Sequence, residues 1–80
     1  MKAIVVVTLK PSVFDPQGNT IADALESLGY DRVGNVRQGK YFELDLDVDS
    51  EAGARELAEQ VAHNLLANPV IESYRIDIPG

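Results

Sequence analysis

The strongest constraint on the fold is a segment near the N-terminus that is apolar on both of its alternating faces. Residues 3–9 read AIVVVTL, and most of them are β-branched. β-branched residues favour extended backbone, and a strand that is apolar on both faces is usually central in its sheet. Lys10 and Pro11 end the segment, because proline has no N–H to donate to a neighbouring strand. The fold must therefore be built around a sheet whose central strand comes first in the chain.

The chain has 80 residues, no cysteine and a formal net charge of −6. This length allows one core, so residues 1–80 form a single domain. A small domain without disulfides often gains stability from a partner, so we expect self-association. The negative charge argues against nucleic acid and against an anionic membrane surface, because both are themselves negative. No apolar run is long enough to span a bilayer, and we therefore expect a cytoplasmic protein.

Two segments predict amphipathic helices, each with a capping residue at its start. Asp15 is expected to cap the first, with Pro16 as the first helical residue and Gly29 as the residue that ends it. Its apolar face consists of Ile21, Leu25 and Leu28. Ser50 is expected to cap the second helix. The apolar stripe of that helix consists of Ala54, Leu57, Ala58, Val61 and Leu65.

The middle of the chain predicts a β-hairpin. Residues 33–37 form a short extended piece, and a turn follows at Gln38 and Gly39, where the glycine supplies a positive φ. The alternative is a bulge at Gly34 within one longer, bent strand. The strand after the turn shows the cleanest alternation in the chain, with one apolar face made of Phe42, Leu44, Leu46 and Val48. A last strand is expected over residues 70–78.

The element order is therefore β-α-β-β-α-β, which predicts an α+β domain with an antiparallel sheet. In the compact, ferredoxin-like form of this order, both helices cover one face of the sheet. The opposite face is then open, and we expect Val5, Val7 or Leu9 to face outward there. A second copy, packed sheet to sheet or edge to edge, would cover that face.

Few residues suggest chemistry. The acidic stripe Glu43, Asp45 and Asp47 has two interpretations, a Mg²⁺ site or a solvated strand face. Alternate residues on a strand lie about 7 Å apart, which favours the solvated face. His63 is the only histidine. We expect it to be exposed on its helix and paired with Glu59, because no nucleophile–base arrangement is visible. We therefore predict no catalytic residue, no cofactor-binding residue and no metal ligand.

Arg37 and Lys40 flank the expected turn. One interpretation is a pair of cations that holds a phosphate or a partner's carboxylate. The other is an ordinary polar hairpin tip without a ligand. The residue types alone leave both open.

Three stretches of sequence, taken together, resemble the PurS family. They are VTLK followed by VFDPQG in residues 7–18, VRQGKYFEL in residues 36–44 and LLANPVIESY in residues 65–74. The segment ALESLGY, residues 24–30, lies between the first two. Each stretch alone is moderately specific, and their order and spacing carry the resemblance. PurS proteins are small subunits of formylglycinamidine ribonucleotide synthetase in bacteria and archaea.

The resemblance implies a non-catalytic accessory subunit of a glutamine-dependent, ATP-consuming ligase in de novo purine synthesis. A glutaminase subunit releases ammonia, and a large synthetase subunit uses it, with ATP and Mg²⁺, to make the amidine. The small subunit would bind no cofactor alone, would bridge the other two, and would form a homodimer or a dimer of dimers. The partner-contact candidates implied by the family pattern are Arg37, Gln38, Gly39, Lys40, Tyr41, Asp15 and Gln17. The alternative function is a small-molecule-binding regulatory module of the ferredoxin-like or ACT-like type.

Overall fold

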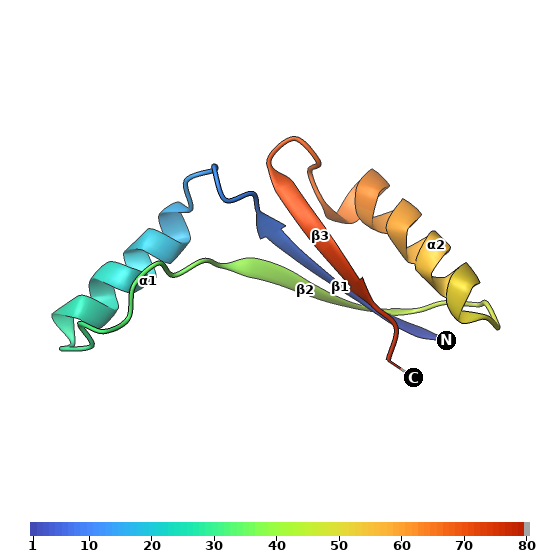
Figure 1. Cartoon of the computed structure of the whole chain (residues 1–80), viewed down its shortest axis with the longest axis horizontal. Helices are drawn as coiled ribbons and strands as arrows, with labels where there is room; N and C mark the ends of the chain where they lie inside the picture. The colour runs from blue at the N-terminus through green and yellow to red at the C-terminus, as the bar shows by residue number, and fades with distance from the viewer. Residues whose placement is uncertain (80) are drawn as a thin grey trace.

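The computed structural model describes residues 1–79 and contains three strands and two helices (Figure 1). The strands are β1 (Lys2–Leu9), β2 (Gly39–Asp45) and β3 (Glu72–Asp77). The helices are α1 (Pro16–Ser27) and α2 (Glu51–Val61), and α2 continues into the π-helical turn η1 (Ala62–Leu66). The α+β class predicted from the sequence is confirmed.

The three strands form one antiparallel sheet in the order β2-β1-β3. The central strand is β1, as its two apolar faces predicted. Val6 lies opposite Tyr41 on one side and opposite Arg75 on the other. This register places the acidic face of β2 and the charged face of β3 on the same side of the sheet.

The core lies between one face of the sheet and the α2–η1 unit. Val5 and Val7 are fully buried there, together with Ala58 and Ala62 from the helical unit. Alanine side chains at these positions let the helix backbone approach the sheet closely. The expectation that Val5 and Val7 face outward is wrong, because α2 covers the face that they share. The alternate residues Ile4 and Val6 lie on the open face instead and are partly exposed.

Both helices begin and end with local hydrogen bonds that the sequence predicted. Asp15 accepts a hydrogen bond from the Gly18 N–H, and Ser50 accepts one from the Gly53 N–H. Gly29 follows α1 with φ 93°, a conformation that glycine adopts without strain. The Tyr30 N–H then donates to the Leu25 carbonyl at 2.9 Å, which closes the helix end in a Schellman motif.

The predicted hairpin in the middle of the chain is absent from residues 1–79, so the four-strand order is wrong. Gly39 pairs with Thr8 as the first residue of β2, and the Gln38 N–H donates to Asp15. With both residues held this way, no turn can form between them. The alternative of one longer bent strand also fails, because Asn35 has φ 55° and interrupts extended backbone.

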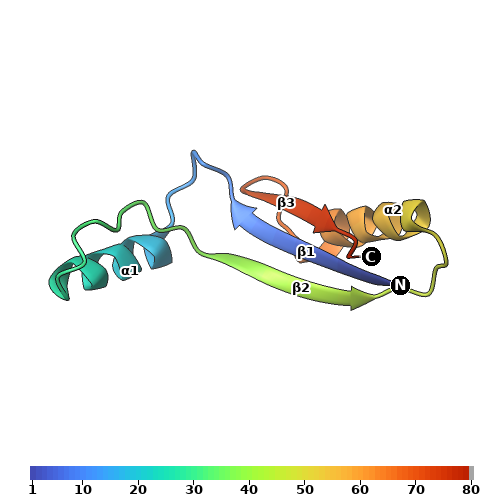
Figure 2. The ribbon, with the colours of Figure 1, turned by 60° about the horizontal axis from the view of Figure 1, so that its bottom comes forward.

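The placement of α1 also differs from the prediction that both helices cover one face of the sheet. Figures 1 and 2 show α1 extending away from the end of the sheet, while α2 packs beside β3 and β1. The molecule is consequently long and flat, with extents of 49 × 27 × 14 Å. The apolar stripe of α1 has no sheet beneath it, and its Leu28 side chain is 73% exposed.

The close approach of α2 to the sheet gives a first test. Ala58→Leu should lower the free energy of unfolding by about 1–3 kcal/mol, because the larger side chain overpacks a site with no free space. Ala52→Leu, at an exposed position of the same helix, should change it by less than about 0.5 kcal/mol. Chemical denaturation of both variants measures the difference, and equal effects would contradict this packing.

Candidate functional site

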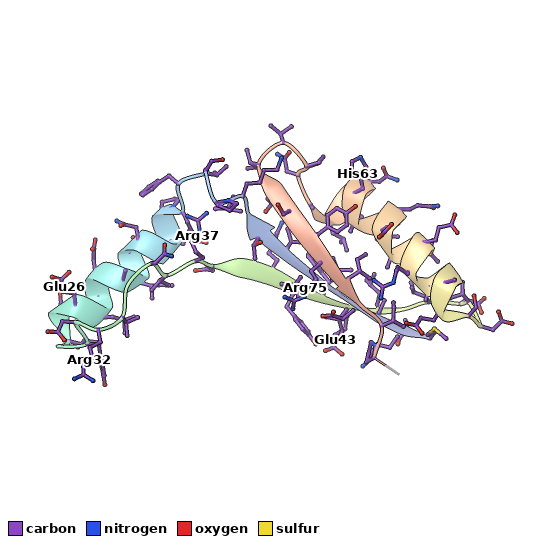
Figure 3. All side chains as sticks on the ribbon, viewed as in Figure 1. Glu26, Arg32, Arg37, Glu43, His63 and Arg75 are labelled. Carbon is purple, nitrogen blue, oxygen red and sulfur yellow. The ribbon has the colours of Figure 1, made fainter. Side chains whose placement is uncertain are left out.

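Two loops that the sequence singled out separately meet where α1 leaves the sheet (Figure 3). The Asp15 carboxylate accepts two backbone hydrogen bonds, from the Gly18 N–H at 2.8 Å and from the Gln38 N–H at 2.7 Å. Asp15 is only 5% exposed, so both bonds are shielded from water. One side chain therefore joins the start of α1 to the start of β2. We call Asp15, Gly18, Arg37 and Gln38 the junction.

Arg37 holds the junction from the other side. Its Nη2 donates to the Lys10 carbonyl at 3.0 Å and to the Val13 carbonyl at 2.8 Å, both in the loop that follows β1. These acceptors are neutral backbone groups, so Arg37 keeps its charge at the surface while its hydrogen bonds fix the loop. The structure thus gives Arg37 an intramolecular role.

The hydrogen bonds at the junction also change the acidity of Asp15. The Gln38 N–H lowers the pKa of Asp15 most, and the Gly18 N–H lowers it further, because both donors favour the charged carboxylate. The nearby Arg37 guanidinium acts in the same direction, against a smaller opposing effect of burial. The carboxylate is therefore charged in the folded protein at neutral pH.

Gly18 is required by close packing at the junction. A Cβ atom at this position would lie 2.1 Å from the Val36 carbonyl oxygen, a distance that real Cβ atoms do not adopt. The missing side chain lets the segment that returns from α1 pass directly against the first turn of the helix.

Lys40 acts at the other end of the sheet face, where η1 ends. Its Nζ donates to the Leu66 carbonyl at 3.3 Å and lies 3.5 Å from the Glu72 carboxylate. A cation at a helix C-terminus is favourable, because the last carbonyls carry partial negative charge. Glu72 also accepts a hydrogen bond from the Asn68 N–H at 2.7 Å. Lys40 therefore connects β2 to the turn between η1 and β3.

The other predicted contact residues are more available. Gln17 lies exposed in the first turn of α1, and Tyr41 lies on the open face of the sheet with 60% of its surface exposed. Gly39 has no side chain to offer, and a Cβ there would lie 2.5 Å from the Val7 carbonyl oxygen. The seven candidates thus divide into residues that fix backbone and two side chains that face solvent.

The acidic stripe is not gathered into one site. Glu43 bonds to Lys2 at 2.8 Å, and this hydrogen bond and the charge of Glu43 raise the pKa of Lys2. Asp45 ends β2, and Asp47 lies beyond it. Within residues 1–79, no group of three or more His, Cys, Asp or Glu side chains is placed to hold a metal ion. The open face of the sheet carries Glu43 and Arg75 side by side (Figure 3).

His63 is exposed on η1, as predicted. The ion pairs found among residues 1–79 do not join it to Glu59. The reason lies in the backbone, because the helix widens into a π-turn at Ala62 and the four-residue spacing no longer aligns the two side chains.

The same widening explains a surface that the sequence pattern missed. Leu65 was assigned to the buried stripe of the second helix, but it is 80% exposed, and Leu66 packs against the core instead. Val70 follows in the turn between η1 and β3 and is 77% exposed. No periodicity reveals this surface, because it depends on where the helix changes its pitch.

Exposed apolar side chains at both ends, around polar groups that are held by backbone atoms, are typical of a small domain that contacts other proteins. No helix within residues 1–79 has both the length and the apolar character needed to cross a membrane. The PurS family model, described as phosphoribosylformylglycinamidine (FGAM) synthase, matches residues 2–80, and the chain belongs to this family. The family resemblance inferred from the three sequence stretches is confirmed.

Curated relatives and solved structures agree with this assignment. The PurS subunit of Synechocystis is 49% identical over 72 residues, which span 90% of this chain and 72% of the relative. A crystal structure of Bacillus subtilis PurS superimposes with a TM-score of 0.84 at 42% identity, over 100% of both chains. A chain in the PurLQS structure of Thermotoga maritima gives 0.87 at 30% identity and covers 95% of this chain and 93% of that one.

The buried carboxylate predicts a specific pH dependence. Because the folded pKa of Asp15 lies below its ordinary value of 3.8, the charged form stabilises the fold above that pH, and the contribution is lost as the pH falls through the folded pKa. Asp15→Asn should therefore be less stable than the wild type at pH 7, and the gap should close in acid. Unfolding free energies measured from pH 7 to pH 2 test this, and a constant gap would contradict it.

The close approach at Gly18 gives a second test of the junction. Gly18→Ala should lower the free energy of unfolding by about 1–3 kcal/mol, because the Val36 carbonyl must move. Gly34→Ala is the matched control, since no heavy atom lies within 4 Å of a Cβ there. Thermal denaturation should separate the two variants clearly. A Gly18→Ala protein as stable as the control would show that the return segment does not pack here.

Proposed function

We propose that this chain is the non-catalytic PurS subunit of an FGAM synthase complex and that it bridges the glutaminase and the ATP-dependent synthetase. The observation that carries the proposal is the likeness to a chain of the Thermotoga maritima PurLQS structure, at a TM-score of 0.87 over 95% of this chain. In this role the chain would help to deliver glutamine-derived ammonia to the synthetase, which converts formylglycinamide ribonucleotide to the amidine.

The chemistry of the complex would then lie in the other subunits. ATP and Mg²⁺ would be bound by the synthetase, and glutamine would be cleaved by the glutaminase, in the cytoplasm. The candidate site supports this division, because Asp15, Arg37 and Lys40 are engaged with backbone atoms of their own chain. Their role is to fix the loops that face the partners.

The turn between η1 and β3 is the surface that we assign to the synthetase. Leu65 and Val70 expose most of their apolar surface at this turn, and Lys40 holds it in place. Large apolar side chains that are exposed on a rigid element gain the most from burial in a partner's pocket. Gln17 and Tyr41 are the further contacts, at the junction and on the open sheet face.

Self-association is the remaining part of the proposal. A homodimer, or a dimer of two such dimers, would present each docking surface twice in a symmetric arrangement. The exposed stripe of α1 supports it, because no other element among residues 1–79 covers that stripe.

Reconstitution tests the bridging role directly. Purified synthetase and glutaminase from the same source are mixed with and without this chain, and amidine formation is followed from glutamine and from ammonium salt. Glutamine-dependent synthesis should require the chain, whereas ammonia-dependent synthesis should need it little. If neither activity responds to the chain, the bridging role is wrong.

Charge placed on the η1–β3 turn should weaken assembly without unfolding the chain. In the double variant Leu65→Asp with Val70→Asp, the concentration for half-maximal glutamine-dependent activity should rise about tenfold or more. The free energy of unfolding of the isolated chain should change by less than about 0.5 kcal/mol, since both side chains are largely exposed. Gln60→Asp, which adds charge at an exposed position of α2, should leave assembly unchanged. An unaffected double variant would exclude this turn as the docking surface.

A further inference from the structure

The chain exposes more surface than a compact protein of its size. Its accessible surface is 5669 Å², whereas a folded monomer of 8.7 kDa is expected to expose about 4,700 Å². Its radius of gyration is 15.8 Å, against about 12 Å for a compact domain of 80 residues. The excess of about 900 Å² is close to the roughly 800 Å² that each partner buries in a standard interface.

Much of this excess belongs to residues 10–38, which we call the arm. It consists of the loop after β1, helix α1 and the segment that returns to β2 (Figure 1). The arm has no core of its own, and its large exposed apolar side chains are Phe14, Ile21, Leu28, Tyr30 and Val33. An amphipathic helix needs an apolar surface to pack against, so the arm is incomplete in a single copy.

The sheet has a matching vacancy over β2. Helix α2 packs on β1 and β3 but makes no comparable contact with β2 within residues 1–79. Phe42 and Leu44, on the face of β2 that continues the core, are consequently only partly buried. In an α+β sandwich with two helices on one face, a second helix would lie here. The outer edge of β2 is also free, because its described pairing is with β1 alone.

The arm cannot fill the vacancy on its own sheet. Doing so requires a turn at Gln38 and Gly39, but Gln38 is bonded to Asp15 and Gly39 is paired with Thr8. The chain instead runs from the arm directly into β2 (Figure 2). An element that is held away from its own acceptor can occupy the same acceptor on a second copy, which is the geometry of domain swapping.

We propose that two copies of this chain exchange arms, so that α1 of each covers β2 of the other and residues 33–37 pair with the free edge of that strand. The proposal rests on the self-association proposed above and specifies its geometry. It restores, between two chains, the hairpin that the sequence predicted within one.

Charge complementarity supports the exchanged register. A hairpin with its turn at Gln38 and Gly39 places Arg32 opposite Asp45 and Val33 opposite Leu44. In the exchanged dimer these pairs form between chains, so a cation meets the acidic end of the partner's β2 and an apolar residue meets an apolar one. The pairing also covers two of the side chains that a single copy leaves exposed or half-exposed.

Lengthening the hinge tests the exchange. Insertion of Asn-Gly between Gln38 and Gly39 supplies a two-residue hairpin turn in the same register and lets each arm fold back on its own sheet. Sedimentation equilibrium should find the wild type as a dimer and the insertion variant as a monomer, with helical circular dichroism retained. The same insertion between Asp31 and Arg32 is the matched control and should remain a dimer. A dimeric hinge variant, or a monomeric wild type, would overturn the exchange.

Cross-linking gives a test that does not depend on the insertion. The chain has no cysteine, so the double variant Arg32→Cys with Asp45→Cys carries the only two thiols. Mild oxidation should join two chains covalently, seen on a non-reducing gel, and neither single variant should do so. A disulfide within one chain, or none, would overturn the exchange. If the wild type proves monomeric yet supports glutamine-dependent synthesis in the reconstitution, the exchange is wrong and the bridging function stands.

Discussion

The architecture depends on one buried carboxylate. Asp15 accepts the N–H of Gly18, which starts α1, and the N–H of Gln38, which lies 23 residues further along the chain. Because the same side chain holds the start of a helix and the entry to a strand, it fixes where α1 leaves the sheet. The Arg37 hydrogen bonds and the glycine at position 18 serve the same joint from either side. A turn at Gln38 is incompatible with this arrangement.

That joint divides the molecule into two unequal parts. The sheet, α2 and η1 share a core of small and β-branched side chains, in which Val5 and Ala58 are fully buried. The arm has no such core, and its apolar stripe is left for another chain. A subunit whose work is to hold other proteins in register gains from this division, because the rigid part positions the docking surfaces while the arm joins copies to each other. The proposed function and the proposed exchange therefore use different surfaces.

Local sequence signals predicted much of the structure correctly. The central position of β1, the caps at Asp15 and Ser50, and the end of α1 at Gly29 all depend on hydrogen bonds or periodicities within a few residues. The candidate site was predicted only as two separate loops. That Asp15 and Gln38 bond to each other is a contact across 23 residues, and no pattern within either loop contains it. Leu65 was misplaced because the helix changes pitch at Ala62.

The sequence by itself determined the family, the class of fold and the identity of the central strand, since each depends on residue type, order and spacing. Only the tertiary structure decided that the hairpin at Gln38 and Gly39 stays open and that α1 stands apart from its own sheet. The physical reason is a competition between two sets of hydrogen bonds for the same backbone. The buried Asp15 carboxylate and the pairing of Gly39 with Thr8 occupy the groups that a turn would need, and the strength of such non-local contacts is not written in local sequence.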